Sequence, residues 1–561
     1  MEHTMSAFQK ARAAYQPVLP DVLRDHRVAL RFEEASMTAG SPEAEQQIRR
    51  RFRHSIGAHR MRAVWFVTKG AEGESVRLKR GPLRVGVVLS GGQAPGGHNV
   101  IAGIWDALQR AHRGSKLYGF KNGPAGVIKG QYEGLTQEKV DLYRNSGGFH
   151  MIGTGRDKIE KPRQLKNCLN VLTRLRLDGL IIIGGDDSNT NAAILAEYLL
   201  KKGSRTRIIG VPKTIDGDLR NRWIGMSFGF DTATKTYAEL VGNICLDCLS
   251  SGKYWYFIRL MGRSASHITL EVALQTHPNL AIISEEVKDK GQTLADVVRE
   301  IVELVCRRAR EKLTHGVVLV PEGLLEFLPD MKLLIKELDH LLKSHERQLK
   351  TLRHRSERCQ FMGTRLSRKS AQVYRSLPED IQEALLKRDS HGHIPLSQIE
   401  TGRLIVELVA EQIAALKDKH QFKGDFRPLS SFFGYEGRSV APSNFDADYT
   451  YALGRAAVQL IRAGLTGYTT SATGLAGPTK AWQMGGLPIA AMLIMEIRKD
   501  RPTPVIRRTL VDLKGKPFGE FDKAREDWKL KDDYISPGPI QYLGPPKLTD
   551  TRTRTLVLER G

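Results

Sequence analysis

Three short segments of this 561-residue chain combine residue types that suit the chemistry of phosphate groups. The first, Ser90–Asn99 (SGGQAPGGHN), lies between an apolar run and a helical pattern. Its glycines would let backbone N–H groups approach an anion, and the start of the following helix favours negative charge. The segment matches neither the P-loop nor the dinucleotide-binding fingerprint. It indicates a phosphate cradle, with a tight structural turn as the alternative.

The second segment is Gly184–Thr190 (GGDDSNT), which follows the run LIII. Two adjacent acids, Asp186 and Asp187, would repel a phosphate unless a metal were present. One carboxylate could hold Mg²⁺, which would then carry phosphate oxygens. Ser188 could cap the helix or donate to phosphate. Capping of the helix by the acids themselves is the alternative.

The third segment is Pro212–Asn221 (PKTIDGDLRN), at the end of another apolar run. Asp216 and Asp218 are two residues apart, and Lys213 precedes Asp216 by three positions. A carboxylate beside a cation can accept a proton from a hydroxyl while the cation offsets charge on a transferring phosphoryl group. A surface Asx turn is the alternative.

Three weaker segments complete a possible binding site. MGRSASH (261–267), PEGLLEF (321–327) and GYEGRS (434–439) each place an Arg or Glu at a strand end or a glycine turn. Arg suits phosphate and Glu suits sugar hydroxyls, although each segment alone is equally compatible with a structural ion pair. Taken together, the six segments predict phosphoryl transfer to a sugar phosphate.

The elements that position these segments follow an α/β pattern. From Leu83 onward, short runs rich in Val and Ile end in glycine turns and lead into helical patterns. Continuous apolar strands of this kind are buried on both faces, which predicts a mainly parallel sheet. Ligands bind at the carboxyl ends of such strands, and the polar segments fall there. Strands are predicted at 84–90, 177–185, 207–216, 256–262, 280–284 and 316–323.

The charge of the chain suggests an anionic partner. Lys and Arg number 86 against 62 Asp and Glu, a net charge of +24. Nucleic acid, an acidic membrane or a phosphorylated small molecule would each fit. The densest basic run is 49–60, which we interpret as a solvated helix or arm covering the main body. Because no nucleic-acid-binding fold surrounds it, nucleic acid is an unlikely partner.

The remaining composition predicts a cytoplasmic protein with no membrane partner. Five cysteines are too few for a disulfide scaffold. Cys245 and Cys248 form one CxxC within an apolar stretch, where buried helix thiols are more plausible than a metal or redox site. No apolar run reaches the roughly 18 residues of a transmembrane helix. The N-terminal residues lack the hydrophobic core of a secretory signal.

The ordered segments SGGQAPGGHN, GGDDS, PKTIDGD, KYWYFIRLMGR, PEGL and GYEGR resemble the phosphofructokinase family, and within it the long-chain diphosphate-dependent members. The resemblance covers about Leu83 to Gly477. It implies two Rossmann-like lobes with mainly parallel sheets, enlarged by a helical insertion and terminal extensions. The expected division is an N-terminal extension (1–80), an N-terminal lobe for diphosphate, Mg²⁺ and the base (81–250), a C-terminal lobe for fructose 6-phosphate (251–327 and 421–477), a helical insertion (328–420) and a C-terminal wrapping segment (478–561).

The resemblance also implies residue roles. Asp186 would bind Mg²⁺, Asp216 would be the general base for O1 of the sugar, and Asp218 would assist it. Diphosphate would be contacted at Gly92, Gly185 and Ser188 and by Arg156 of the segment GGFHMIGTGRDK (147–158). Fructose 6-phosphate would be held by Thr214, Ile215, Asp216, Met261, Gly262, Arg263, Glu322, Tyr435, Glu436, Gly437 and Arg438.

In dimers of the family a partner chain completes the sugar-phosphate site. The matching positions here are Lys253 and Tyr254, so a homodimer or higher homo-oligomer is expected. ATP-dependent relatives of the family commonly have Arg at the position of Tyr254.

Two positions predict the phosphoryl donor. ATP-dependent members typically read GGDG and PGTID, whereas this chain reads GGDD and PKTID. Asp187 would fill the space of the ATP α-phosphate and repel its charge. Lys213 would replace part of the lost stabilisation. The predicted reaction is reversible phosphorylation of fructose 6-phosphate by diphosphate. An ATP-dependent 6-phosphofructokinase and a regulatory subunit of the diphosphate-dependent enzyme are the alternatives.

Overall fold

The computed structural model describes residues 5–24, 28–56, 61–68, 78–387, 394, 399–498 and 501–560. The chain divides into two compact units. Unit 1 contains residues 1–236, 435–509 and 540–560, and unit 2 contains residues 237–434 and 510–539. Helix α10 (Phe230–Ser251) begins in unit 1 and continues into unit 2.

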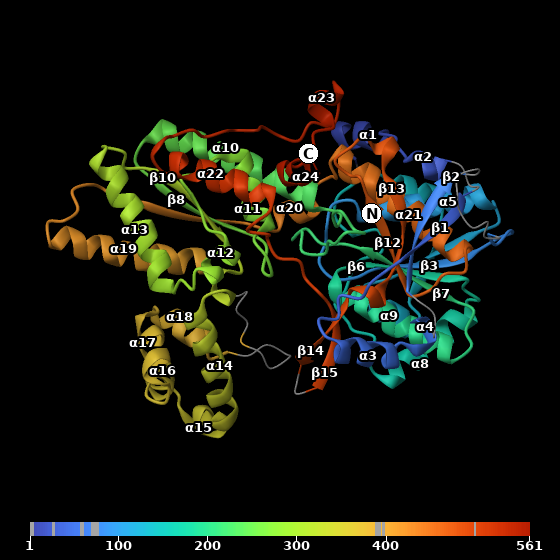
Figure 1. The fold of residues 1–561 in the computed structure, drawn as a ribbon, viewed down its shortest axis with the longest axis horizontal. Coiled ribbons are helices and arrows are strands. Elements are labelled where there is room, and N and C mark those ends of the chain that lie inside the picture. Colours follow the sequence, from blue (N-terminus) through green and yellow to red (C-terminus); the bar gives the residue numbers. More distant parts are fainter. Residues whose placement is uncertain are drawn as a thin grey trace. The chain divides into compact units, whose positions relative to one another are not determined.

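Unit 1 is built on a nine-stranded sheet (Figure 1). Its five central strands are mutually parallel, as the continuous apolar runs predict, and antiparallel strands extend both edges. In spatial order the strands are β1 (Val28–Glu34), β2 (Arg62–Thr68), β13 (Gln483–Pro488), β12 (Tyr468–Thr473), β7 (Arg207–Pro212), β6 (Gly179–Gly184), β3 (Arg84–Leu89), β4 (Lys116–Phe120) and β5 (Tyr132–Leu135).

Helices cover both faces of this sheet, which is why its middle strands β3, β6 and β7 are apolar along their length (Figure 1). On one face α8 (Pro162–Arg174) and α9 (Asp186–Lys201) share a hydrophobic core with alternate residues of the strands, such as Leu180 and Ile182. On the other face α5 (Gly97–Ala111) packs against α21 (Asn444–Arg462).

Register brings three strand ends to one level. Leu89 of β3 pairs with Ile183 of β6, and Gly184 of β6 pairs with Pro212 of β7. The segments that follow these strands therefore meet at one edge of the sheet, as the sequence predicts.

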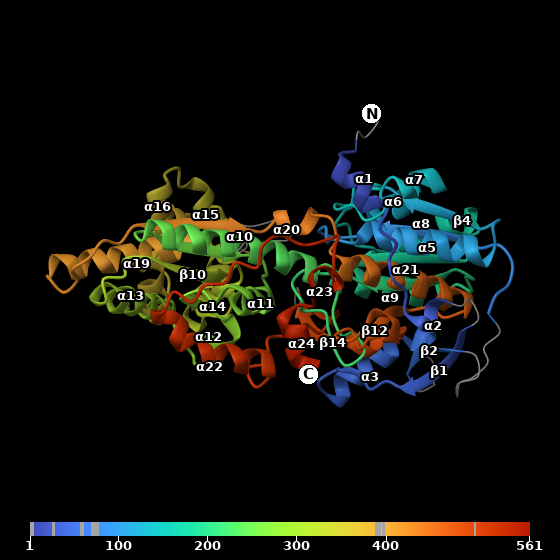
Figure 2. The same cartoon turned by 90° about the horizontal axis from the view of Figure 1, so that it is seen from above.

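Unit 2 contains a four-stranded parallel sheet in the order β11 (Pro428–Phe433), β8 (Trp255–Leu260), β10 (Gly316–Pro321) and β9 (Leu280–Ala281). Its helices include α11 (His267–Thr276), α22 (Lys516–Leu530), α13 (Leu294–Arg310) and α19 (Thr401–Asp418). Figure 2 shows α13 and α19 side by side, and both share a core with Trp255 and Phe257 of β8.

The predicted helical region forms. Helices α14 (Pro329–Ser344), α15 (Glu346–Thr351), α16 (Arg355–Gly363), α17 (Arg368–Ser376) and α18 (Glu379–Ala384) follow β10 (Figure 1), and their apolar residues share one hydrophobic core with α13 and α19. Helix α19 also packs on β8 and β11, and Arg259 of β8 pairs with Glu400 at 2.8 Å. The last part of the predicted insertion is therefore a layer of the unit 2 sheet.

The N-terminal region contains two strands that sequence analysis did not identify. Strands β1 and β2 pair with each other, and β2 pairs with β13 at the edge of the large sheet. The basic run begins in α3 (Pro42–Arg51) and α4 (Arg53–Ile56), while residues 57–60 lie outside the described chain. As predicted, the described part is helical and packs on the body, with Glu197 of α9 accepting from the amides of His54 and Ser55.

The two units divide the chain differently from the predicted lobes at two places. The division falls within α10 rather than after it. Residues 435–477 pack with unit 1, because α21 covers its sheet and β12 is one of its strands. The C-terminal segment serves both units, through β13, β14 (Leu493–Arg498), β15 (Arg501–Ile506), α23 (Pro546–Thr549) and α24 (Arg554–Arg560) in unit 1 and α22 in unit 2.

The remaining short helices are α1 (Ala7–Ala13), α2 (Asp21–Arg24), α6 (Pro124–Lys129), α7 (Gln137–Asp141), α12 (Ser284–Asp289) and α20 (Glu436–Ser439). Cys245 and Cys248 are buried on α10, as expected for helix thiols, and burial raises the pKa of the Cys248 thiol to about 11. Within the described ranges, no helix is long and apolar enough to cross a membrane.

The contact between α5 and α21 gives a stability prediction. A Cβ atom on Gly454 would lie 2.2 Å from the backbone oxygen of Val100, so the two helices could not stay as close. We expect Gly454→Ala to lower the free energy of unfolding by about 2 kcal/mol, as overpacking does, despite the helix preference of Ala. Urea denaturation monitored by circular dichroism would measure the change.

Gly134→Ala is the matched control, because a Cβ atom at Gly134 would meet no atom within 4 Å. Equal stability of the two variants would contradict close helix packing as the reason for Gly454.

Candidate active site

The glycine-rich segment after β3 forms a turn that opens α5. Gly91 and Gly96 have φ angles of +87° and +102°, which other residues rarely adopt. The amide of Gly91 donates to the carbonyl of Gly155 at 2.9 Å, and the Thr154 hydroxyl donates to the carbonyl of Gly91 at 2.7 Å. The two loops predicted to contact diphosphate, 90–99 and 147–158, thus lie side by side.

Arg438 reaches the same turn. Its Nη2 donates to Oε1 of Gln93 at 2.7 Å. A Cβ atom on Gly92 would lie 2.3 Å from this nitrogen, so a side chain at Gly92 would displace the guanidinium. The segment Tyr435–Arg438, predicted from a separate part of the sequence, therefore belongs to the site of unit 1.

The acids Asp186 and Asp187 occupy the first turn of α9, just after Gly185. The hydroxyl of Ser188 donates to that of Ser90 at 2.8 Å, which ties this turn to the glycine-rich segment. Asp187 is half exposed and lies 3.3 Å from Nζ of Lys158. The N-cap residue of α9 is Gly185 and no side chain caps the helix, so capping by the acids is not observed, and both carboxyl groups lie at the carboxyl end of β6.

Lys213 is the buried cation of the site. The residue directly follows β7 and is only 6% exposed. Its backbone amide donates to the carbonyl of Gly184 at 3.0 Å. Burial, followed by the positive charge of Arg438, lowers the pKa of the Lys213 ammonium to about 8. The negative charges of Asp216 and Asp186 oppose this shift, and Arg156 adds to it. Charged groups from four separate segments therefore act on one ammonium.

Asp218 is the buried carboxyl group. It is 8% exposed, and burial followed by the charges of Asp216 and Asp186 raises its pKa to about 7. The amide of Asp216 donates to the hydroxyl of Thr214 at 3.0 Å, and Ile215 is buried, so the backbone of this turn is fixed. Asp216 itself is only half-buried and can face a ligand.

The carboxylate oxygens of this site would suit a Mg²⁺ ion that binds together with a phosphate group. Mg²⁺ prefers oxygen ligands and is usually held by one or two carboxylates together with substrate phosphates. Asp186 and its neighbours provide such oxygens, and burial together with the charges of Asp216 and Asp186 raises the pKa of Asp218, so a cation here would be favourable. Across the described residues, no group of three or more His, Cys, Asp or Glu is arranged to hold a metal ion by itself.

Unit 2 contributes a second group of predicted residues. The amide of Gly262 donates to Oε2 of Glu322 at 3.2 Å, and the amide of Gly323 donates to the carbonyl of Gly262. A Cβ atom on Gly323 would lie 1.9 Å from the carbonyl oxygen of Arg263, so close approach of the two loops requires glycine. Met261, Gly262, Arg263 and Glu322 therefore form one constellation at the carboxyl ends of β8 and β10.

Lys253 and Tyr254 do not join that constellation. They precede β8, whereas Met261 follows it, and the six-residue strand separates them by roughly 20 Å at about 3.3 Å per residue. Lys253 is exposed and its Nζ lies 5.3 Å from the centre of the Tyr254 ring. A single copy of unit 2 thus holds the two predicted groups at opposite ends of one strand.

Sequence analysis missed one charged residue of the site. Arg508 follows β15, and its Nε donates to Oδ2 of Asp186 at 2.9 Å. No local pattern marks it, because it lies 322 residues away in the C-terminal segment.

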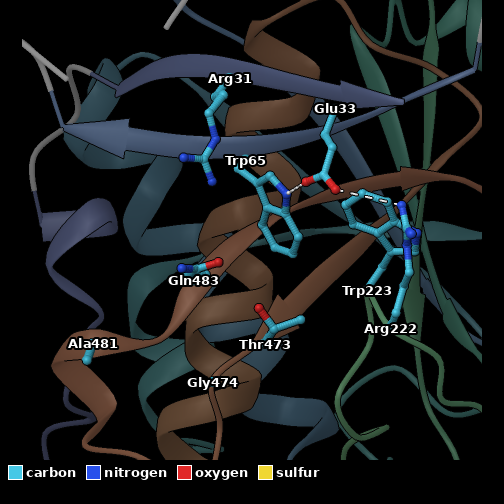
Figure 3. Close-up of a pocket in the computed structure, with 9 residues that line it drawn as sticks. All are labelled: Arg31, Glu33, Trp65, Arg222, Trp223, Thr473, Gly474, Ala481 and Gln483. Atoms are coloured by element: carbon cyan, nitrogen blue, oxygen red, sulfur yellow. Dashed lines mark hydrogen bonds and ion pairs between the residues drawn. The ribbon is translucent and has the colours of Figure 1, made fainter. Parts of the chain in front are cut away.

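A hollow of about 410 Å³ lies elsewhere in unit 1 (Figure 3). Trp65 donates to Glu33 at 3.0 Å, and Arg222 lies over the Trp223 ring at 4.4 Å. Because Trp65 also packs against Trp223, neither ring presents an open face to a ligand. None of the predicted site residues lines this hollow.

Comparison with known proteins matches residues 84–461 to the family described as Phosphofructokinase. A relative from Porphyromonas gingivalis, named pyrophosphate–fructose 6-phosphate 1-phosphotransferase, is 47% identical over 99% of both chains. A beta 2 subunit of the enzyme of that name from Arabidopsis thaliana is 49% identical over 85% of this chain and 82% of its own.

Among solved structures, a pyrophosphate-dependent phosphofructokinase from Marinobacter aquaeolei has a TM-score of 0.52 at 14% identity. It covers 84% of this chain and 98% of its own, and supports the fold alone.

Proposed function

Because the chain belongs to the phosphofructokinase family, we propose that it transfers a phosphoryl group reversibly between diphosphate and fructose 6-phosphate. The products are phosphate and fructose 1,6-bisphosphate. The observation that carries this proposal is the full-length similarity to diphosphate-dependent relatives, combined with a site in which Asp186, Lys213 and Asp216 face a glycine-rich turn.

Asp216 is the general base in this proposal. As O1 of the sugar attacks the terminal phosphorus, the carboxylate accepts the O1 proton, the bond to the bridging oxygen breaks and phosphate leaves. Asp218 is a poorer base, because its raised pKa of about 7 leaves much of it protonated near neutral pH. It supports Asp216 from a buried position.

The cations of unit 1 hold the diphosphate. Lys213 lies 3.4 Å from the position of a Cβ atom on Gly91, and so faces the turn on which phosphate would rest. Arg156 and the backbone at Gly92 supply further contacts, with Gly185 and Ser188 at the start of α9. Mg²⁺ bound by Asp186 would neutralise phosphate oxygens and orient them.

The predicted fructose 6-phosphate residues of each unit are assigned separately. In unit 1, Thr214, Ile215 and Asp216 would bind near O1, and Tyr435, Glu436, Gly437 and Arg438 would hold the 6-phosphate. In unit 2, Met261, Gly262 and Arg263 follow β8, and Glu322 would bind sugar hydroxyls. The hydrogen bond from Gly262 to Glu322 supports assigning these two residues to one ligand.

The separation of Lys253 and Tyr254 from Met261 supports a homo-oligomer with shared sites. Residues at the far end of β8 cannot serve the site of their own unit 2, but they can complete that of a second copy. We propose a homodimer as the smallest active form. The free thiols of the chain agree with the cytoplasmic location that the sequence predicts.

The two alternatives are less favoured. ATP dependence would require room for an α-phosphate where Asp187 stands, and the full-length relatives are named for diphosphate. A regulatory subunit would have no need of Asp186, Asp216 and Arg263, all of which are present. Turnover by the purified chain alone, with diphosphate but not with ATP, would exclude both.

Asp216→Asn tests the base. We expect kcat to fall on the order of 10²-fold or more while substrates still bind, because a general base contributes roughly 10²–10⁴. Asp218→Asn is the matched variant, and we expect a smaller loss. Steady-state kinetics in the forward direction measure both. A kcat for Asp216→Asn near that of the unmodified enzyme would refute the assignment.

Asp187→Gly tests the choice of donor. The change removes both bulk and charge and frees Lys158, so we expect measurable turnover with ATP. Asp187→Asn keeps the bulk and removes the charge. If ATP is used by the Gly variant alone, size excludes ATP, and if both variants use it, charge does. Absence of ATP turnover in both would show that Asp187 does not set donor choice.

The pKa of Lys213 predicts an alkaline limit. Because this pKa is lowered to about 8, the ammonium of the free enzyme loses its proton well below the range of an exposed lysine. We expect kcat/KM for diphosphate, at fixed free Mg²⁺, to fall above about pH 8. Lys213→Met should be less active, and its kcat/KM should not show this fall at alkaline pH. A wild-type profile that stays flat to pH 9.5, about 1.5 units above this pKa, would contradict the prediction.

A further inference from the structure

The C-terminal segment places a guanidinium against the predicted metal carboxylate. Besides its 2.9 Å hydrogen bond to Oδ2 of Asp186, Nε of Arg508 lies 4.0 Å from Oδ2 of Asp218. One cation therefore faces two carboxyl groups at the anion-rich edge of the sheet.

The backbone on either side of Arg508 is anchored independently of its side chain. The amide of Arg507 donates to the carbonyl of Met492 at 3.0 Å. On the other side, the Thr509 amide donates to the carbonyl of Asp218 at 2.7 Å, and its hydroxyl donates to the carbonyl of Arg220 at 2.6 Å. The Arg508 ion pair is thus not needed to attach the segment.

The oxygen that binds Arg508 is also one that a metal would use. Oδ2 of Asp186 accepts from Nε, and Mg²⁺ would need a carboxylate oxygen at about 2.0–2.1 Å while repelling the guanidinium. The Arg508 side chain is 45% exposed, so it has solvent into which it can rotate while its backbone stays in place.

We propose that Arg508 is a diphosphate-binding residue that exchanges partners during the reaction. It neutralises Asp186 and Asp218 before metal binds, and it turns to diphosphate oxygens when the metal takes Asp186. A guanidinium suits both partners, since it binds carboxylate and phosphate through the same planar fork. The inference rests on the proposed function, because it requires Asp186 to be a metal ligand.

The exchange predicts two opposite changes in Arg508→Gln. Binding of Mn²⁺ alone, measured by calorimetry on the full chain without diphosphate, should tighten roughly threefold, because an exposed ion pair no longer competes for Asp186. Binding of magnesium diphosphate should weaken about tenfold or more, because charged hydrogen bonds to phosphate are lost. Arg507→Gln is the control, since this neighbouring arginine is also exposed and its side chain has no part in the proposed exchange, and it should change neither affinity.

Other outcomes overturn the inference. If Arg508 only stabilises the C-terminal segment, Arg508→Gln lowers the melting temperature and leaves Mn²⁺ affinity unchanged. Weakening of both affinities also contradicts an exchange. Should Arg508→Gln fail to fold, Arg508→Lys replaces it, and tighter Mn²⁺ binding is again expected because the Nε hydrogen bond is lost.

Asp186→Asn separates this inference from the proposed function. If it binds Mn²⁺ as the unmodified chain does, Asp186 is not a metal ligand, and the metal assignment falls together with the inference. If it weakens Mn²⁺ binding while Arg508→Gln has no effect, the metal assignment stands and the inference alone is wrong.

Discussion

The arrangement of unit 1 depends on holding like charges together at one edge of a sheet. Asp186, Asp216 and Asp218 follow two neighbouring parallel strands, and burial beside the other two acids raises the pKa of Asp218 to about 7. Such a cluster is unfavourable unless cations compensate it. Lys213 and Arg508 supply that compensation from a strand end and from the C-terminal segment. This balance of charges supports the proposal that the site takes a ligand that brings metal and phosphate together.

Several features of the fold serve this constraint. The helices on both faces keep the strands dry and fix the level at which they end. The close crossing of α5 and α21, which requires Gly103 and Gly454, joins the glycine-rich turn to a helix more than 300 residues later. The pairing of β12 with β7 draws the segment before it, and with it Arg438, into unit 1. Distant parts of the chain thus converge on the glycine-rich turn, where we propose that diphosphate binds.

The proposed choice of donor rests on the same electrostatics. Asp187 adds a further negative charge at the start of α9, where the helix dipole and Lys158 stabilise it. In the proposed function, the bulk and charge of Asp187 exclude a longer nucleotide donor, and the two donor variants test this role.

The sequence alone predicted the α/β class, the strands β3, β6, β7, β8, β9 and β10, and the candidate site residues that follow several of them, but not β4, β5, β12 or β13. Buried parallel strands are continuous apolar runs, and polar residues after them belong to the ligand edge, so Asp186, Lys213 and Asp216 could be recognised locally. The edge strands β1 and β2 were not predicted, because their sequences carry no strong strand pattern. They are strands because they pair with each other and because β2 pairs with β13. Only tertiary structure assigned Arg438 to the glycine-rich turn and Arg508 to Asp186, because contacts across hundreds of residues leave no periodic signal. The structure also shows that Lys253 and Met261 lie at opposite ends of β8. Although the two residues are close in the sequence, the length of the extended strand keeps them from contacting the same ligand.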